Sequence, residues 1–269
     1  MHRSRRSAAD EGASEIEMEP MVGKRPPRAQ PVFSADEDAR AGFVRKVFGI
    51  LGAQLLPTAL IAGTIACHGR AWLHRSPASA SAVLSVSSFG ALALTLVFSC
   101  CPEVMRRYPT NYALLACFTA AEGVMVGFVC LRYAMPSVVF CACLTAVVVI
   151  GLTIYAARTK RDFTGFGPYL LCALLGLAST GLLLGICASF GQAHTGGFAA
   201  LEIIQAGAAA LIFSFHIVYD TQLILGGNHK HEFCVDDYAM AAVALYLDII
   251  QLFIALLRLL GRGDDDGGL

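Results

Sequence analysis

Long apolar segments alternate with short polar loops along most of this chain. From Phe43 onward seven such segments can be recognised, and they cover roughly residues 43–66, 82–101, 111–131, 135–156, 168–190, 198–225 and 238–260. About 20 apolar residues in a helix are enough to cross the hydrocarbon core of a bilayer. The pattern therefore predicts an all-α membrane protein, a bundle of seven transmembrane helices.

The seventh segment is the one whose path the pattern leaves open. It carries Asp248 and Gln251 well inside it and Arg258 close to its end. If it crosses the membrane as a central helix of the bundle, the C-terminus lies on the side opposite to the N-terminus. If it is re-entrant, its polar residues line a cavity and the tail returns to the starting side, because irregular backbone is tolerated in a membrane only inside protein.

Composition supports the membrane assignment and excludes several function classes. Hydrophobic residues make up 56% of the 269 residues and charged residues only 15%, against about 45–50% and 25% in soluble domains. The ten cysteines include no CxxC pair, so the pattern is not that of a zinc site or a disulfide framework. There is no GxSxG motif and no cluster of histidines, so we expect no enzyme and no cofactor. We expect membrane lipid, and no nucleic acid, among the partners.

The two ends of the chain differ from its middle. Residues 1–40 combine basic residues, an acidic run and prolines without apolar clusters, which predicts a disordered cytosolic arm. Residues 41–261 form the predicted seven-helix membrane domain, and residues 262–269 form a short acidic tail.

The distribution of Lys and Arg predicts the orientation in the membrane. With the N-terminus in the cytosol, fifteen Lys and Arg residues lie on the cytosolic side, nine of them before or at the start of the first helix, and five lie on the opposite side. Cytosolic loops carry an excess of basic residues in membrane proteins. We therefore predict a cytosolic N-terminus.

Two acidic residues inside the last two apolar segments are the main candidate site. Asp220 lies just before the Gly226–Gly227 pair that should end the sixth helix, and Asp248 lies about ten residues into the seventh. A carboxylate inside a membrane costs about 2.5–3.5 kcal/mol even on insertion scales, so such residues are usually functional. Two carboxyl groups close together in a low dielectric cannot easily both be charged. If the two acids meet, they have the chemistry of a proton-sensitive switch, and neighbours such as Gln222 and Tyr246 are the predicted hydrogen-bond partners. The alternative is two unrelated acids, each bonded to backbone or to a basic partner.

Four other residues are candidates for an ion path or a counter-charge. Glu122 lies near the middle of the third segment, followed by Gly123 and Gly127, which would let another helix approach. It either lines a cation path or is a protonated structural residue. Arg106 and Arg107 follow the second segment and either reach inward to the acids or extend to the lipid headgroups. His216 precedes Asp220 by four residues and either titrates with it or is a core histidine bonded to backbone or hydroxyl.

Several motifs in this order resemble one known family. They are FVRKVFGILGAQLLPTALIAG at 43–63, RRYPTNYALL at 106–115, TKRDFTGFG at 159–167, YDTQLILGG at 219–227 and LYLDIIQLFIALLRLLG at 245–261. Together they resemble the transmembrane Bax-inhibitor-motif proteins, specifically the lifeguard branch, over about residues 43–261.

The resemblance implies a seven-helix fold and a suppressor of cell death that permits a pH-responsive calcium leak. By motif, it implies that Asp220 and Asp248 are the proton-sensing pair. It also implies an endoplasmic-reticulum or Golgi membrane, with the plasma membrane or endolysosome as alternatives.

Two functional hypotheses remain at this point. In the first, the protein is a calcium leak channel, with calcium as the permeant ion and Asp220 and Asp248 as transient calcium ligands. In the second, it is a non-conducting membrane scaffold that inhibits death signalling through protein partners such as apoptosis regulators.

Overall fold

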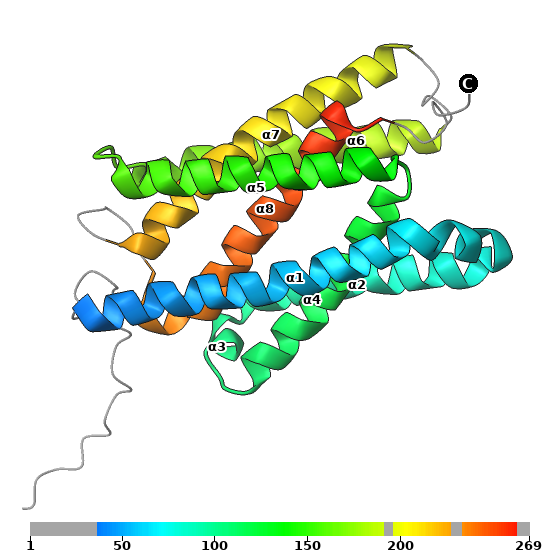
Figure 1. The fold of residues 1–269 in the computed structure, drawn as a ribbon. Helices are drawn as coiled ribbons and strands as arrows, with labels where there is room; N and C mark the ends of the chain where they lie inside the picture. Colours follow the sequence, from blue (N-terminus) through cyan, green and yellow to red (C-terminus); the bar gives the residue numbers. More distant parts are fainter. Residues whose placement is uncertain (1–36, 191–195, 227–232, 263–269) are drawn as a thin grey trace, which may run out of the picture.

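Helices account for the regular structure of the computed structural model, which describes residues 37–190, 196–226 and 233–262 (Figure 1). Within these ranges there are eight α-helices, two short 3-10 helices and no strand. In chain order they are α1 (Glu37–Arg75), α2 (Pro77–Cys100), α3 (Pro102–Met105), α4 (Thr110–Cys130), α5 (Met135–Arg158), η2 (Thr164–Phe166), α6 (Gly167–Ser189), α7 (Gly196–Leu225), η4 (Val235–Asp237) and α8 (Tyr238–Leu260).

Seven of these helices correspond to the seven predicted segments, and all seven are long and apolar enough to cross a membrane. The all-α, seven-span fold class is therefore confirmed. Two features differ from the prediction. The first helix extends well beyond residues 43–66 at both ends, and the four-residue α3 was not predicted. The disordered arm and the acidic tail fall almost entirely on residues 1–36 and 263–269, outside the described residues.

The helix ends follow local sequence signals. Pro77, Pro136 and Pro168 lie in the first turns of α2, α5 and α6, where a proline loses no helical hydrogen bond. Gly226 ends α7 with a φ of 61°, and its N–H donates to the Gln222 carbonyl at 3.1 Å. A left-handed residue after the last turn is a common helix stop and is easiest for glycine. The predicted break after the sixth span is therefore confirmed at Gly226.

The last helix, α8, lies at the centre of the bundle. Twelve of its 23 residues are buried, whereas α6 has no buried residue. Figure 1 shows α8 crossing between α1 and α5. Beyond its end the Arg262 carbonyl accepts a hydrogen bond from the Ala134 N–H at 3.0 Å. Because α8 begins beside α3 and finishes against the α4–α5 turn, it traverses the bundle and is not re-entrant.

Helices α1 and α4 approach each other closely. A β-carbon placed on Gly127 would lie 2.8 Å from Cβ of Ile65, and one on Gly123 would lie 3.1 Å from Cβ of Ile61. Small residues four apart allow membrane helices to approach closely. Gly123 and Gly127 therefore admit a neighbouring helix, as predicted, and that helix is α1.

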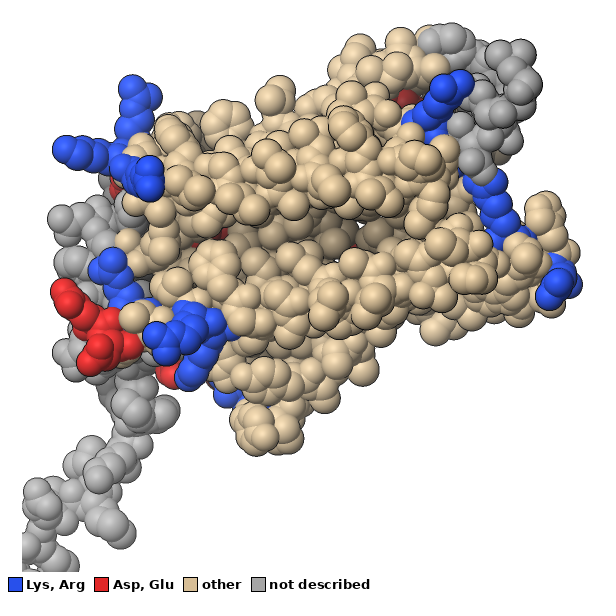
Figure 2. Space-filling view, viewed as in Figure 1, with Lys and Arg blue, Asp and Glu red and all other residues tan. Residues whose placement is uncertain are grey.

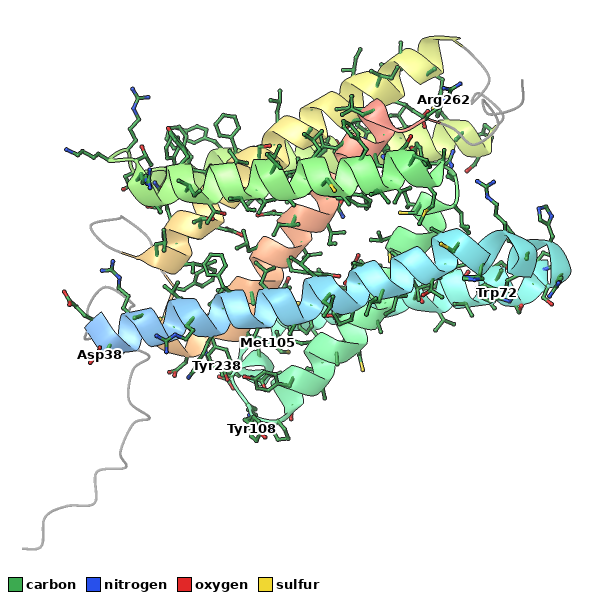
Figure 3. The ribbon with its side chains drawn as sticks, in the orientation of Figure 1. Asp38, Trp72, Met105, Tyr108, Tyr238 and Arg262 are labelled. Carbon is green, nitrogen blue, oxygen red and sulfur yellow. The ribbon has the colours of Figure 1, made fainter. Side chains whose placement is uncertain are left out.

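Charged residues gather at the two ends of the bundle. Figure 2 shows an uncharged band between them, and large apolar side chains such as Phe89 and Leu182 are exposed within it. In Figure 3 Asp38, Tyr108 and Tyr238 lie at one end and Trp72 and Arg262 at the other. We call the end where α1 begins the near end and the opposite one the far end. An apolar band closed by charged ends identifies a multi-pass membrane protein.

Candidate functional site

Asp220 and Asp248 come together between α7 and α8, in the near half of the bundle. Their side chains are buried, with 7% and 6% of the residue surface exposed. The two carboxyl groups interact with each other. Oδ2 of Asp248 is fully buried and has no hydrogen-bond partner in the part of the chain that the structure describes.

The polar neighbours of these acids bond elsewhere, so that part of the prediction is wrong. The Gln222 side chain accepts a hydrogen bond from the Phe163 N–H at 2.8 Å and donates to the Arg161 carbonyl at 2.9 Å. It therefore holds the loop between α5 and α6. The Tyr246 hydroxyl lies 2.8 Å from Oγ1 of Thr58 on α1. The two carboxyl groups therefore have mainly each other as interaction partners.

Arg106 does not neutralise the acid pair. Its Nε donates to Oδ1 of Asp237 at 2.7 Å, and this ion pair joins the α3–α4 turn to the start of α8. The hydrogen bond to Asp237 is the main cause that raises the pKa of the Arg106 guanidinium. Arg107 is exposed at the same end. Both arginines therefore lie at the surface of the bundle.

His216 is half-buried on α7 and contacts its own helix. Its Nδ1 lies 3.0 Å from the Ile212 carbonyl, and its ring centroid lies 6.0 Å from that of Phe213. This geometry is that of a core histidine bonded to backbone, one of the two alternatives that the sequence left open.

A second buried polar cluster joins α1, α4 and α8. Gln54 donates through Nε2 to Oγ1 of Thr119 at 3.2 Å, and Thr58 contacts Tyr246. Glu122 is buried one turn after Thr119, with 7% of its surface exposed. Sequence reasoning singled out Glu122 but missed its neighbours. The available signal was the spacing of Gln54 and Thr58, one helical turn apart in an apolar segment.

Comparison with known proteins gives a consistent result. Residues 40–265 match the family described as "Inhibitor of apoptosis-promoting Bax1". The chain belongs to this Bax-inhibitor family. Human protein lifeguard 3 is 35% identical over 229 residues, which cover 84% of this chain and 70% of the relative. LIFEGUARD 4 of Arabidopsis thaliana is 35% identical over 234 residues, 85% of this chain and 88% of its own length. The resemblance to the lifeguard branch is thereby confirmed.

The site of this Bax-inhibitor family member does not resemble a resident metal centre. Within residues 37–190, 196–226 and 233–262, no three His, Cys, Asp or Glu side chains gather closely enough to hold a metal ion. Asp220 and Asp248 offer carboxylate oxygens, which suit calcium, but a tight calcium site takes six to eight oxygen ligands.

Proposed function

We propose that this protein is a pH-responsive calcium leak channel that suppresses apoptosis from an intracellular membrane, either endoplasmic reticulum or Golgi. The family description supports the coarser part, an apoptosis-inhibiting membrane protein. The finer part rests on one observation, the buried contact between Asp220 on α7 and Asp248 on the central helix α8. We also propose a cytosolic N-terminus, on the basis of the Lys and Arg distribution.

In the proposed mechanism the two carboxyl groups share one proton. A hydrogen bond between a carboxylic acid and a carboxylate is stronger than one between neutral groups, so it would hold α8 against α7. In the described chain no basic group acts on either carboxyl, and Tyr219 is the other titratable group that interacts with Asp220. The charge of the pair is therefore decided by protons or by a passing cation.

Loss or gain of a proton would change the contact between α7 and α8. Two carboxylates in a low dielectric repel each other, and two neutral acids lose the charge-assisted bond. Because α8 packs on α1, α4, α5 and α7, its displacement would alter the packing along the whole bundle. A shift between two such states is a physical route to a pH-dependent calcium path.

The test is calcium flux from liposomes that contain the purified protein, measured across a pH series. Asp220→Asn and Asp248→Asn each keep the side-chain shape but remove the titration. Each should flatten the pH dependence, and the double variant should add little, because residues that act as a unit are not additive. Glu103→Gln is the matched control, since Glu103 is an exposed acid on α3.

Two outcomes would reject parts of this proposal. If the wild-type protein gives no flux and Asp220→Asn changes nothing, the channel is wrong and the function is that of a non-conducting scaffold with protein partners. If flux occurs but the two substitutions shift its pH dependence independently and additively, the shared proton is wrong.

A further inference from the structure

A cavity opens at the far end of the bundle between α6, α7 and α8. It has a volume of about 800 Å³, and its mouth carries Arg132, Tyr133, Glu202 and Arg258. The cavity exists because α6 packs on α7 and has no buried residue of its own. The α6 helix is therefore held away from the central helix.

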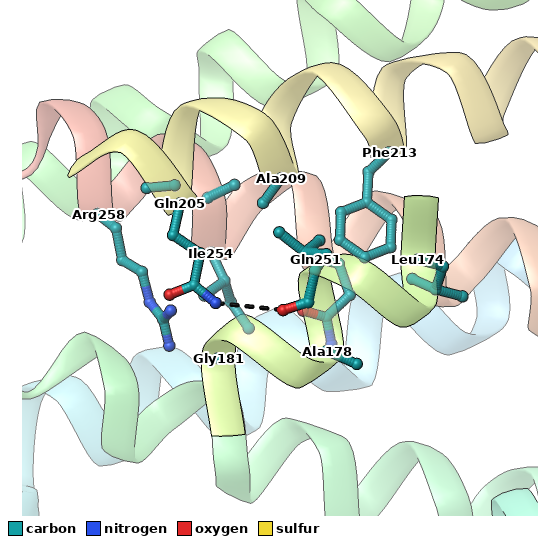
Figure 4. Close-up of a pocket in the computed structure, with 12 residues that line it drawn as sticks. Leu174, Ala178, Gly181, Gln205, Ala209, Phe213, Gln251, Ile254 and Arg258 are labelled. Carbon is teal, nitrogen blue, oxygen red and sulfur yellow. Dashed lines mark hydrogen bonds between the residues drawn. The ribbon is translucent and has the colours of Figure 1, made fainter. Parts of the chain in front are cut away.

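The cavity continues inward and sideways. A second space of about 300 Å³ shares Gly181, Gln205 and Arg258 with it and reaches Leu174 and Phe213 (Figure 4). A third of about 490 Å³ follows the outer side of α6 and α7 and is almost wholly apolar. Gln205 lines all three spaces. It therefore lies between the interior of the bundle and the apolar groove along the outer side of α6 and α7.

The polarity of the lining changes with depth. Charged groups are confined to the mouth, and no ion pair joins Arg132, Glu202 or Arg258 to another residue in the described part of the chain. Gln251 lies about 10 Å deeper than Arg258, from the rise of 1.5 Å per helical residue. Gln205 lies beside it, with Nε2 donating to the Leu177 carbonyl at 3.4 Å. Beyond these amides the wall is apolar.

We propose that this cavity binds a phospholipid whose head group carries a phosphate and a primary ammonium, as in phosphatidylethanolamine. Arg132 and Arg258 match the phosphate, and the Glu202 carboxylate matches the ammonium. The amides of Gln205 and Gln251 lie at the depth of the ester groups, and one acyl chain fills the wall formed by Leu174 and its neighbours. A free anion or water would leave that apolar wall unfilled.

The inference goes beyond the proposed leak and does not depend on it, because its test measures binding alone. The full-length protein in detergent micelles is titrated with phosphatidylethanolamine, phosphatidylcholine or phosphatidylglycerol, and the one-to-one complex is quantified by native mass spectrometry. Phosphatidylethanolamine should bind most tightly. Arg258→Gln and Arg132→Gln should each weaken it about tenfold, the scale of a charge-assisted hydrogen bond. Arg75→Gln, at the same end but outside the cavity, should not.

Three further measurements make the proposal refutable even if an arginine variant does not fold. Glu202→Gln should reduce the affinity for phosphatidylethanolamine to that for phosphatidylcholine. Gly185→Leu should block binding, because Gly185 lines the cavity and has open space around it. Gly151→Leu, also in open space but on α5, is the control. Inorganic phosphate should not displace the lipid.

Each contrary result would overturn the proposal. These are equal binding of the three lipids, displacement by phosphate, unchanged binding in Glu202→Gln, and identical binding in the two leucine variants.

Discussion

Substitution of Gly127 by alanine tests the close contact between α1 and α4, two of the helices against which the central helix α8 packs. The new β-carbon would lie 2.8 Å from Cβ and 3.0 Å from Cδ1 of Ile65 on α1. Rotation of the isoleucine can move Cδ1 away but not Cβ, which is attached directly to the backbone. The two helices must therefore separate by several tenths of an ångström.

The size of the effect follows from two opposing contributions. Overpacking of a well-packed core costs about 1–3 kcal/mol. Replacement of glycine by alanine inside a helix stabilises it by about 0.5–1 kcal/mol, mainly through chain entropy. The net destabilisation by Gly127→Ala should thus be roughly 0.5–2 kcal/mol. A β-carbon on Gly151 of α5 would have no neighbouring atom within 4 Å. Gly151→Ala should therefore show only the stabilisation of the helix.

The assay is equilibrium unfolding of the purified protein in mixed micelles, followed by circular dichroism. Gly123→Ala, with a closest approach of 3.1 Å, should lie between the other two variants. We expect the free energy of unfolding to fall in the order Gly151→Ala, Gly123→Ala, Gly127→Ala, with about 1–3 kcal/mol between the first and the last. If Gly127→Ala is as stable as Gly151→Ala, the close contact between α1 and α4 is wrong.

Three further predictions concern the near end and the orientation. Arg106→Gln should cost less than about 1 kcal/mol, because its ion pair with Asp237 is partly exposed, and the loss should shrink at high salt in unfolding measurements. The hydrogen bond to Asp237 raises the pKa of the Arg106 guanidinium, so the stability that it adds is present at every pH below the unfolded pKa and is lost only in strong alkali. The loss on substitution should therefore be constant between about pH 6 and 9, and a loss that varies there would contradict this. Gln222→Met should lower the free energy of unfolding by about 1–3 kcal/mol, because two backbone groups of the α5–α6 loop lose their partner, and faster proteolysis of that loop is the direct readout. A glycosylation acceptor in residues 191–197 should be modified and one in 158–164 should not; the reverse result would invert the orientation.

The spans of this protein could be predicted because they depend on local properties. A run of about 20 apolar residues must be helical in a membrane, since no water is present to satisfy its backbone. The meeting of Asp220 and Asp248 could also be predicted, because α7 and α8 are consecutive and each acid lies at a similar depth from the loop between them. Two glycines four residues apart in one segment also predicted that another helix approaches closely at Gly123 and Gly127. The sequence did not indicate that this helix is α1.

The tertiary structure alone decided where the polar side chains bond. Tyr246 is two residues from Asp248 but contacts Thr58, 188 residues away. The sequence left open whether Arg106 reaches the acids or the lipid headgroups, and the structure pairs it with Asp237, 131 residues away. The direction of a side chain depends on the rotation of its helix and on which helix packs beside it, and neither is encoded in one segment. The cavity between α6 and α8, with charged residues at its mouth, also depends on how these helices pack. It could not be predicted from the sequence, because α6 and α8 have similar runs of apolar residues.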